Sequence, residues 1–270
     1  MIKTEHTIET KEADFHDKWA ESTTVDDIHV KEAFETNASP ENQQILSWMG
    51  DLKDKKILEL GCGLGEASVY FAMQGANVLA TDISEGMTKK ALELATRHHV
   101  NLEATVVSAN DISAIPDNSF DYVYAGNLLH HVDIEKCVKM LHPKLKEGGS
   151  ALFWDPIAYN PIINIYRNIA TEVRTEDEHP LKRSDILIIE KIYSQVEVKY
   201  FWLTSLSIFL YYFLIKRYDP NKVRYWKQIL SDSEKNHSFL KITHAIDRFL
   251  FLIFPPLKFL AWNVAIKARK

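Results

Sequence analysis

The 270-residue sequence has only two cysteines, Cys62 and Cys137. Small secreted proteins that depend on disulfide bonds need several cysteines, so a disulfide-based fold is excluded. Two thiols are typical of a protein in a reducing compartment, and we predict a cytoplasmic location. The composition, 46% apolar and 26% charged, is that of a folded globular protein with a sizeable core.

Long apolar runs are also lacking. A helix that spans a bilayer needs roughly 20 consecutive apolar residues, and the two best candidates are shorter or interrupted. They are residues 206–215 and residues 249–266, the second of which contains Pro255, Pro256 and Lys258. The first residues, 1–11, are polar and contain no apolar signal-peptide core. We therefore predict no transmembrane helix.

The chain as a whole has no excess of basic residues. It carries 32 Lys and Arg against 37 Asp and Glu, a net charge of −5. Proteins that bind nucleic-acid duplexes usually present a basic face, so no nucleic-acid partner is predicted. The charge is uneven, because residues 216–270 contain twelve basic and four acidic side chains, a balance of +8. The rest of the chain therefore carries −13.

Short apolar strands alternate with helices from residue 56 onward. Strands are predicted at 56–60, 77–81, 102–107, 120–125 and 150–154, and helices at 65–74, 84–98 and 134–145. Such alternation is typical of crossover units on a parallel sheet, whose ligands bind at the carboxyl ends of the strands. Residues 12–50 are predicted to be helical, with Ser39 capping a helix that starts at Pro40.

The regular alternation ends after residue 156. Residues 156–180 are interpreted as a helical excursion, and residues 195–203 and 259–268 as an antiparallel strand pair that completes the sheet. The strongly apolar segment between these strands is interpreted as a helical cap. The predicted organisation is an N-terminal helical lid (1–50), a core (51–203 and 257–270) and an inserted cap (204–256).

A glycine-rich turn follows the first predicted strand. Gly61, Gly63 and Gly65 alternate with other residues, and glycine lets the backbone turn tightly and approach a ligand closely. A dinucleotide-binding loop would favour Gly-x-Gly-x-x-Gly, with a pyrophosphate at the helix N-terminus. Here Glu66 places a carboxylate at that terminus, where it would repel phosphate. The loop therefore favours a ligand with a cationic end and no phosphate.

Acidic and amide side chains follow the next two predicted strands. Asp82 ends the second strand, where a carboxylate can accept hydrogen bonds from both ribose hydroxyls. Asn110 and Asp111 follow the third strand, where an amide or acid can accept a hydrogen bond from an adenine amino group. Ile83 and Ile112 are expected to sandwich the adenine ring. These positions predict a site for a nucleoside.

In this order and at these intervals, the elements resemble class I S-adenosylmethionine-dependent methyltransferases of the small-molecule type over roughly residues 40–155. The resemblance implies a Rossmann-like fold, a seven-stranded sheet with an antiparallel last strand, and S-adenosylmethionine as the cofactor. It places Asp82 at the ribose, Asp111 at the adenine amino group and Asn127 beside the sulfonium. The implied cofactor-binding residues are Glu59, Gly61, Cys62, Gly63, Gly65, Asp82, Ile83, Met87, Asn110, Asp111, Ile112 and Asn127.

Two histidines, His130 and His131, follow the fourth predicted strand, and Asp155 follows the fifth. A hydroxyl acceptor needs a base to remove its proton, and histidine is the usual one. A Leu-His-His sequence followed by such an Asp resembles small-molecule O-methyltransferases in which these residues act as bases. We predict His130, His131 and Asp155 as catalytic residues, and no metal ion. The alternatives are a helix cap and a packed ring for the histidines, and a turn at Asp155-Pro156.

The segment after the fifth strand could contact an acceptor. Its candidate side chains are Tyr159, Arg167, Arg174 and His179. Ordinary salt bridges are the favoured alternative for these residues.

The C-terminal segment combines apolar and basic side chains. An apolar stripe at helical spacing comprises Phe239, Ile242, Ile246, Phe249 or Leu250, and Ile253. Cations lie between these positions, at Lys235, Lys241 and Arg248. The stripe has three interpretations: the core of the cap, a contact with an anionic membrane surface, or a wall around a lipophilic acceptor.

Together these features predict a methyltransferase that acts on a small or lipophilic acceptor, preferably at oxygen. The predicted partners are this acceptor and, through residues 204–256, a membrane surface. One rival is a nucleotide-dependent oxidoreductase, which Glu66 and the missing third glycine disfavour. A second is a non-catalytic membrane adaptor that retains the fold. A nucleic-acid methyltransferase is disfavoured, since no Asn-Pro-Pro-Tyr-like tetrapeptide follows the fourth strand.

Overall fold

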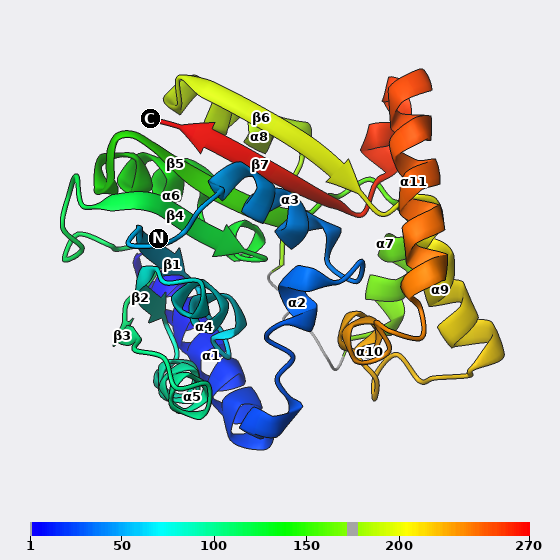
Figure 1. Cartoon of the computed structure of the whole chain (residues 1–270), viewed down its shortest axis with the longest axis horizontal. Helices are drawn as coiled ribbons and strands as arrows, with labels where there is room; N and C mark the ends of the chain where they lie inside the picture. The colour runs from blue at the N-terminus through cyan, green and yellow to red at the C-terminus, as the bar shows by residue number, and fades with distance from the viewer. Residues whose placement is uncertain (1, 172–177) are drawn as a thin grey trace.

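One seven-stranded sheet organises the computed structural model, which describes residues 2–171 and 178–270 (Figure 1). The strands are β1 (Lys56–Leu60), β2 (Asn77–Asp82), β3 (Glu103–Val106), β4 (Phe120–Gly126), β5 (Leu145–Pro156), β6 (Gln195–Phe201) and β7 (Asn263–Arg269). Their order is β3-β2-β1-β4-β5-β7-β6, and only β7 runs antiparallel to its neighbours. The predicted α/β fold class, with its antiparallel last strand, is confirmed.

Helices connect the strands and cover both faces of the sheet. The described helices are α1 (Ile2–Ser22), α2 (Glu32–Glu35), α3 (Pro40–Met49), α4 (Glu66–Met73), α5 (Glu85–Arg97), α6 (Ile134–Leu141), α7 (Pro161–Ile169), α8 (Arg183–Ile192), α9 (Ser207–Leu210), α10 (Tyr225–Ser231) and α11 (His237–Ile253). Side-chain caps fix several starts, because Ser84, Asp133 and Asn160 each accept a backbone N–H three residues on. Helix α3 begins at Pro40 as predicted, but the Ser39 side chain makes no capping hydrogen bond.

Two apolar layers hold the sheet between its helices. On one face, strand residues such as Leu58, Val123 and Phe153 pack with Val138 of α6 and Ile189 of α8. On the other face, α3, α4 and α5 pack on the alternate strand residues, which include Ile57, Val78 and Leu152. Because successive strand residues point to opposite faces, both faces of these strands are apolar, as a doubly covered parallel sheet requires.

The sequence-based boundaries hold within a few residues from β1 to α6. Before β1, the stretch 12–50 that was predicted to be helical is divided among α1, which already begins at Ile2, the short 3₁₀ segment η1 (Val25–Asp27), α2 and α3. From β5 onward the boundaries hold less well, since β5 begins at Leu145 rather than at residue 150. Helix α8, which crosses from β5 to β6, was not predicted. Strand β7 begins at Asn263 rather than at residue 259, because Pro255 and Pro256 start a short 3₁₀ segment, η6 (Pro255–Leu260). The antiparallel pairing of β6 with β7 is as predicted.

The segment between β6 and β7 is helical and has a core of its own. It contains the short 3₁₀ segment η4 (Thr204–Leu206), α9, the adjoining π-helical turn η5 (Tyr211–Ile215), α10 and α11. Its buried residues include Trp202, Phe209, Tyr212, Tyr225 and Leu240, and Ile163 of α7 joins them. We call residues 204–260 the cap; it lies at one end of the molecule beside α7 (Figure 1). Within the described residues, no helix has both the length and the apolarity needed to cross a bilayer.

Candidate active site

The loop between β1 and α4 depends on its three glycines. Gly61, Gly63 and Gly65 have φ angles of +71°, +53° and +93°, a region that residues with a Cβ rarely adopt. A Cβ on Gly61 would lie 2.7 Å from Leu128, and one on Gly65 would lie 2.6 Å from the Cβ of Ala91. Beside Gly63 there is open space within 4 Å, so the backbone is accessible there to a ligand.

Asp82, at the end of β2, ties this loop to the start of α5. One carboxylate oxygen accepts a hydrogen bond from the Gly63 N–H at 2.9 Å, and the other accepts one from the Ser84 N–H at 3.0 Å. The side chain is buried, and burial raises the pKa of Asp82 while the two N–H donors oppose that rise. Each carboxylate oxygen has a second lone pair, so the group can still accept hydrogen bonds from a ligand.

A cavity of about 460 Å³ lies over the glycine loop at the carboxyl ends of β1, β2 and β4. Its size is that of a typical small-molecule site. Seven acidic residues and no lysine or arginine line it among the described residues; the acids are Glu9, Glu12, Glu41, Glu59, Glu66, Asp82 and Asp133. Such a wall attracts cations and repels phosphates.

Burial perturbs the carboxyls at the base of this cavity. Glu59 is fully inside the protein and hydrogen-bonded to Ser68, and burial raises its pKa to about 8. Burial likewise raises the pKa of Glu66. The neighbouring Glu66 and Asp82 charges add to the rise at Glu59. A cation placed among these groups would favour their ionised forms.

Most of the cofactor-binding residues predicted from the sequence line this cavity. Those that do are Glu59, Gly61, Cys62, Gly63, Asp82, Ile83, Asn110 and Asn127. Cys62 is buried, and burial raises the pKa of its thiol well above the usual value, which fits a small filler rather than a nucleophile.

Four of the predicted residues do not line the cavity. Gly65 packs against Ala91 beneath the loop, and Met87 and Ile112 are completely buried in the two apolar layers. Asp111 is exposed, and its carboxylate accepts a hydrogen bond from the Ser113 N–H at 3.1 Å. Its neighbour Asn110 faces the cavity, and the amide oxygen of Asn110 is buried without a hydrogen-bond partner.

Helix α1, part of the segment predicted as an N-terminal lid, closes one side of the cavity through residues that the sequence analysis did not single out. Glu9, Glu12, His16 and Trp19, spaced at three and four residues, share one helix face and line the cavity. A carboxylate oxygen of Glu9 accepts hydrogen bonds from Ser108 at 2.7 Å and from the Asn110 amide at 3.0 Å. The spacing of Glu9, Glu12, His16 and Trp19 at three and four residues was the one sequence signal that could have indicated this face of α1.

The three predicted catalytic residues lie together at the ends of β4 and β5. His130 Nδ1 lies 2.7 Å from an oxygen of Asp155, and both side chains are buried. Asp155 also accepts hydrogen bonds from the backbone N–H groups of Leu129 and His130 at 3.3 Å. Burial raises the pKa of Asp155, and these donors oppose the rise. Asp155 lines neither the cavity nor the smaller hollow beside it, whereas His130 lines the smaller hollow.

His131 occupies a different position from His130. The two rings lie 4.0 Å apart, but His131 lines both the large cavity and a neighbouring hollow of about 140 Å³. Its Nδ1 is buried, makes no hydrogen bond and lies 3.5 Å from a carboxylate oxygen of Glu12. Asn127 lines both spaces as well. The side chain of His131 is therefore the one predicted base that stands where the two spaces meet.

The smaller hollow is lined mainly by aromatic and basic side chains. They are Phe15, Trp19, Tyr166, Trp226 and Trp262, with Arg167 and Arg224. The guanidinium of Arg224 stacks 4.0 Å from the Trp19 ring. Of the other acceptor candidates, Tyr159 accepts a hydrogen bond from the Arg183 N–H away from the hollow, and His179 donates its backbone N–H to the His130 carbonyl. Arg174 lies outside the described residues.

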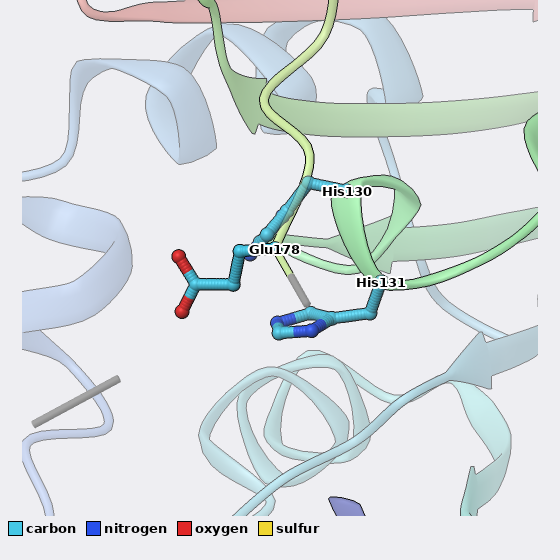
Figure 2. A group of neighbouring side chains, drawn as sticks. All are labelled: His130, His131 and Glu178. Carbon is cyan, nitrogen blue, oxygen red and sulfur yellow. The ribbon is translucent and has the colours of Figure 1, made fainter. Parts of the chain in front are cut away.

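Glu178 approaches the histidine pair from the chain that precedes α8 (Figure 2). His130, His131 and Glu178 each place one ligand-type atom within 4.8 Å of the others. Two imidazoles and one carboxylate are a common ligand set for divalent transition metals. Burial lowers the pKa of the Arg224 guanidinium, and the nearby Glu178 carboxylate opposes that fall by its electrostatic attraction. The three side chains therefore form either an ion-pair cluster or a metal site.

Residues distant in sequence complete the far wall of the large cavity. Trp154 donates its indole N–H to the Tyr124 hydroxyl at 2.8 Å, and Tyr124 donates to Asn42 at 2.9 Å. Glu41 accepts a hydrogen bond from Asn263 at 2.6 Å, and burial raises its pKa to about 7. No local sequence pattern marks these positions.

Known methyltransferases resemble this chain both in fold and in the sequence region that contains the glycine loop. A family model described as a methyltransferase domain matches residues 58–153. A ubiquinone biosynthesis O-methyltransferase from Pseudomonas syringae pv. tomato is 28% identical over 131 residues, which cover 47% of this chain and 56% of the relative. A phosphoethanolamine N-methyltransferase from Triticum aestivum is 33% identical over 118 residues, 42% of this chain and 23% of the relative. The chain thus spans about half, or less, of the length of these relatives.

The fold also matches solved structures over most of the chain. A SAM-dependent methyltransferase from Archaeoglobus fulgidus has a TM-score of 0.56 at 17% identity and covers 89% of this chain and 97% of its own. A Haemonchus contortus phosphoethanolamine N-methyltransferase 2, in complex with S-adenosylhomocysteine, has a TM-score of 0.55 at 20% identity over 86% of this chain and 52% of its own.

Proposed function

We propose that this chain, which carries a class I S-adenosylmethionine-dependent methyltransferase domain, transfers a methyl group to an oxygen atom of an acceptor with an apolar body. The observation that carries the proposal is the position of His131, whose ring lines both the cofactor-sized cavity and the aromatic hollow next to it. A cofactor in one space and an acceptor in the other would bring methyl group and acceptor oxygen together at this ring.

The residues of the large cavity suit S-adenosylmethionine. Its acidic lining matches a ligand with an ammonium and a sulfonium, and the backbone at Gly63 is open to contact. Asp82 would hold the ribose hydroxyls, and the amide oxygen of Asn110, buried without a partner, could accept a hydrogen bond from the adenine amino group. The bound cofactor would supply an electrophilic methyl group. Because no lysine or arginine lines this cavity among the described residues, a pyrophosphate-bearing cofactor is disfavoured.

The protein's own contribution to the chemistry would be alignment and proton removal. The cofactor, held by Asp82 and Asn110, would give its methyl group to the acceptor oxygen, with the electron pair of the broken carbon–sulfur bond left on sulfur. The acceptor hydroxyl proton passes to the imidazole of His131. His130, fixed through its Nδ1 by Asp155, packs against the His131 ring and holds it in place. The aromatic walls of the hollow would bind the acceptor's apolar body.

We expect cofactor affinity to rise with pH, because Glu59 has a raised pKa of about 8 in the empty protein. A cationic ligand favours the ionised carboxylate, so it lowers this pKa, and binding below pH 8 releases a proton. Affinity should therefore increase by up to about tenfold per pH unit between pH 5.5 and 7.5. Isothermal titration calorimetry with S-adenosylhomocysteine measures the affinity at each pH, and repeating it in buffers of different ionisation enthalpy measures the number of protons released. In Glu59→Gln the affinity for S-adenosylhomocysteine should depend much less on pH. If the affinity of that variant rises with pH as steeply as that of the parent protein, another group releases the proton.

A second mechanism is supported by the ligand-type atoms of His130, His131 and Glu178, which lie within 4.8 Å of one another. A divalent metal bound there could polarise the acceptor hydroxyl in place of a histidine base. We favour the base, since Glu178 interacts with Arg224 and a nearby cation weakens metal binding. We therefore expect turnover to change less than about twofold after dialysis against EDTA. A loss above tenfold that added Mn²⁺ or Zn²⁺ reverses would assign these side chains to a metal.

The proposed reaction is tested with radiolabelled S-adenosylmethionine and separate extracts of lipids, quinones and sugars. A labelled product in the lipid or quinone extract, stable to base treatment as an ether is, would support O-methylation of an apolar acceptor. A labelled sugar, or an N-methylated product, would overturn the acceptor class. If the chain bound liposomes but had no affinity for the cofactor, the rival adaptor function would replace the methyltransferase.

A further inference from the structure

Helix α11 has a buried face of mixed polarity and an exposed apolar face. On the buried face, Leu240 packs in the core of the cap, Phe251 packs in an apolar layer of the sheet, and His244 and Asp247 are buried with polar partners. The opposite stripe, which comprises Phe239, Ile242, Ile246, Phe249 and Ile253, is exposed, and Ile242 and Phe249 each have 60% of their surface accessible. A helix that only packs on a protein core needs one apolar face. The exposed stripe must therefore have another use.

The exposed stripe belongs to a larger apolar surface. Of the 21 exposed large apolar side chains in the described part of the chain, fifteen lie in the cap. Neighbouring ones follow on α9 and η5, at Leu210, Tyr211, Phe213, Leu214 and Ile215, and after α11, at Phe254, Phe259 and Leu260. The cap forms one end of the molecule (Figure 1). Isolated exposed apolar residues are common, but a concentration of this kind marks an interaction surface.

The charges on this part of the cap have one dominant sign. Lys216, Arg217, Lys241, Arg248 and Lys258 make no ion pair within the described residues. Most nearby acidic side chains already have partners. Asp247 accepts hydrogen bonds from residues 203–205. Asp232 forms an ion pair with Lys235, and Asp219 lies 3.9 Å from Lys222. Glu234 is the exposed acid that remains. The apolar surface is therefore surrounded by cations.

We propose that this outer face of the cap, residues 207–217 and 239–260, docks on the surface of an anionic lipid bilayer. Apolar side chains would enter the boundary between headgroups and acyl chains while the cations contact anionic headgroups. A twofold dimer through the same face would set these cations against their own copies, which is unfavourable. Since no described helix is suited to span the bilayer, the cap would lie in the plane of the surface.

The same cap borders the proposed reaction site. Trp226, Ile229 and Leu230 of the cap line the large cavity. Trp226 also lines the hollow beside His131, so docking of the cap would offer a lipophilic acceptor a route from the membrane along the cap to this hollow. This route rests on the proposed function, whereas membrane docking does not.

Vesicle flotation with the full chain and no cofactor tests the docking. We expect the protein to float with vesicles of phosphatidylcholine and phosphatidylglycerol (7:3), and at least about tenfold less with pure phosphatidylcholine. Ile242→Ser with Phe249→Ser should lower the partition coefficient more than about tenfold. Lys241→Glu with Arg248→Glu should lower it by about 25-fold or more, at about fivefold for each lost cation.

The matched control removes apolar surface elsewhere. Leu92→Ser with Val106→Ser changes two exposed side chains of α5 and β3, at the other end of the molecule (Figure 1), and should float like the parent protein. Circular dichroism and thermal unfolding verify that each variant is folded. Equal flotation of the parent and the Ile242→Ser, Phe249→Ser variant, or no flotation of the parent, would overturn the proposal. So would a parent protein that is dimeric by light scattering and a double-serine variant that is monomeric, because the face would then bind a second copy.

Discussion

Replacing His131 by asparagine should lower kcat by about 10³-fold and leave cofactor affinity within about threefold. General-base catalysis contributes roughly 10²- to 10⁴-fold, and asparagine cannot accept the acceptor's proton. The Nδ1 of His131 makes no hydrogen bond, so its loss should cost the fold little. Initial rates with labelled cofactor and calorimetry with S-adenosylhomocysteine separate the two effects.

The hydrogen-bonded pair of His130 and Asp155, which lies next to His131, provides a control for the His131 substitution. Asp155→Asn keeps the shape of the side chain but weakens its bond to His130 Nδ1, so kcat should fall by only about 10- to 100-fold. His130→Asn should likewise lower kcat less than His131→Asn does, because His130 only positions the neighbouring ring. A larger loss of kcat in His130→Asn than in His131→Asn would exchange the roles of the two rings.

The sheet could be predicted because each of its early elements carries a local signal. Residues 56–60 form an apolar run that ends at a glycine turn, and β1 occupies those residues. The cap residues Ser84 and Asp133 precede helices with apolar faces. After β5 these signals weaken. Helix α8 was overlooked because its start at Lys182 lacks a serine, threonine or aspartate cap.

Of the residues predicted to bind the cofactor, Glu59 and Asp82 on strands both line the cavity, whereas of Asn110 and Asp111 in the loop after β3 only Asn110 does. Strand periodicity fixes which side of the sheet a residue faces, but a loop has no such period. Asp111 and Asn110 are adjacent, and only the backbone turn decides that Asn110 faces the cavity while Asp111 caps the Ser113 N–H in solvent. The family resemblance implied Met87 as a cofactor-binding residue, yet its side chain is buried in the apolar layer and does not line the cavity.

Contacts between distant segments could not be predicted at all. Glu9 meets Asn110, and Glu41 meets Asn263, across 101 and 222 residues. Helix α11 is a second case in which the sequence does not reveal the tertiary contacts. Its sequence has apolar residues on the stripes through Leu240 and through Ile242, and composition cannot tell which stripe is covered. The tertiary structure separates them, because Leu240 joins the core of the cap and Ile242 does not.

Asp82→Ala should weaken cofactor binding by more than tenfold, while Asp111→Ala should change it less than about twofold. The Asp82 carboxylate holds the Gly63 and Ser84 N–H groups and lines the cavity, so its loss removes both a ligand contact and the support of the loop. Asp111 is exposed and bonded only to the next turn. Calorimetric titration of both variants measures the difference.

Asp82→Ala would also weaken binding if Asp82 only supported the glycine loop. A second ligand that lacks the ribose hydroxyls is therefore compared in the parent protein and in the variant. S-adenosylhomocysteine should bind the parent protein at least about tenfold more tightly than its 2′,3′-dideoxy analogue, because two hydrogen bonds to a buried carboxylate are lost. In Asp82→Ala the two ligands should bind equally. If the variant still prefers the hydroxylated ligand, another residue holds the ribose and Asp82 only shapes the loop. If Asp111→Ala proves the weaker binder instead, the loop after β3 must rearrange when the adenine enters, and Asn110 is not its partner.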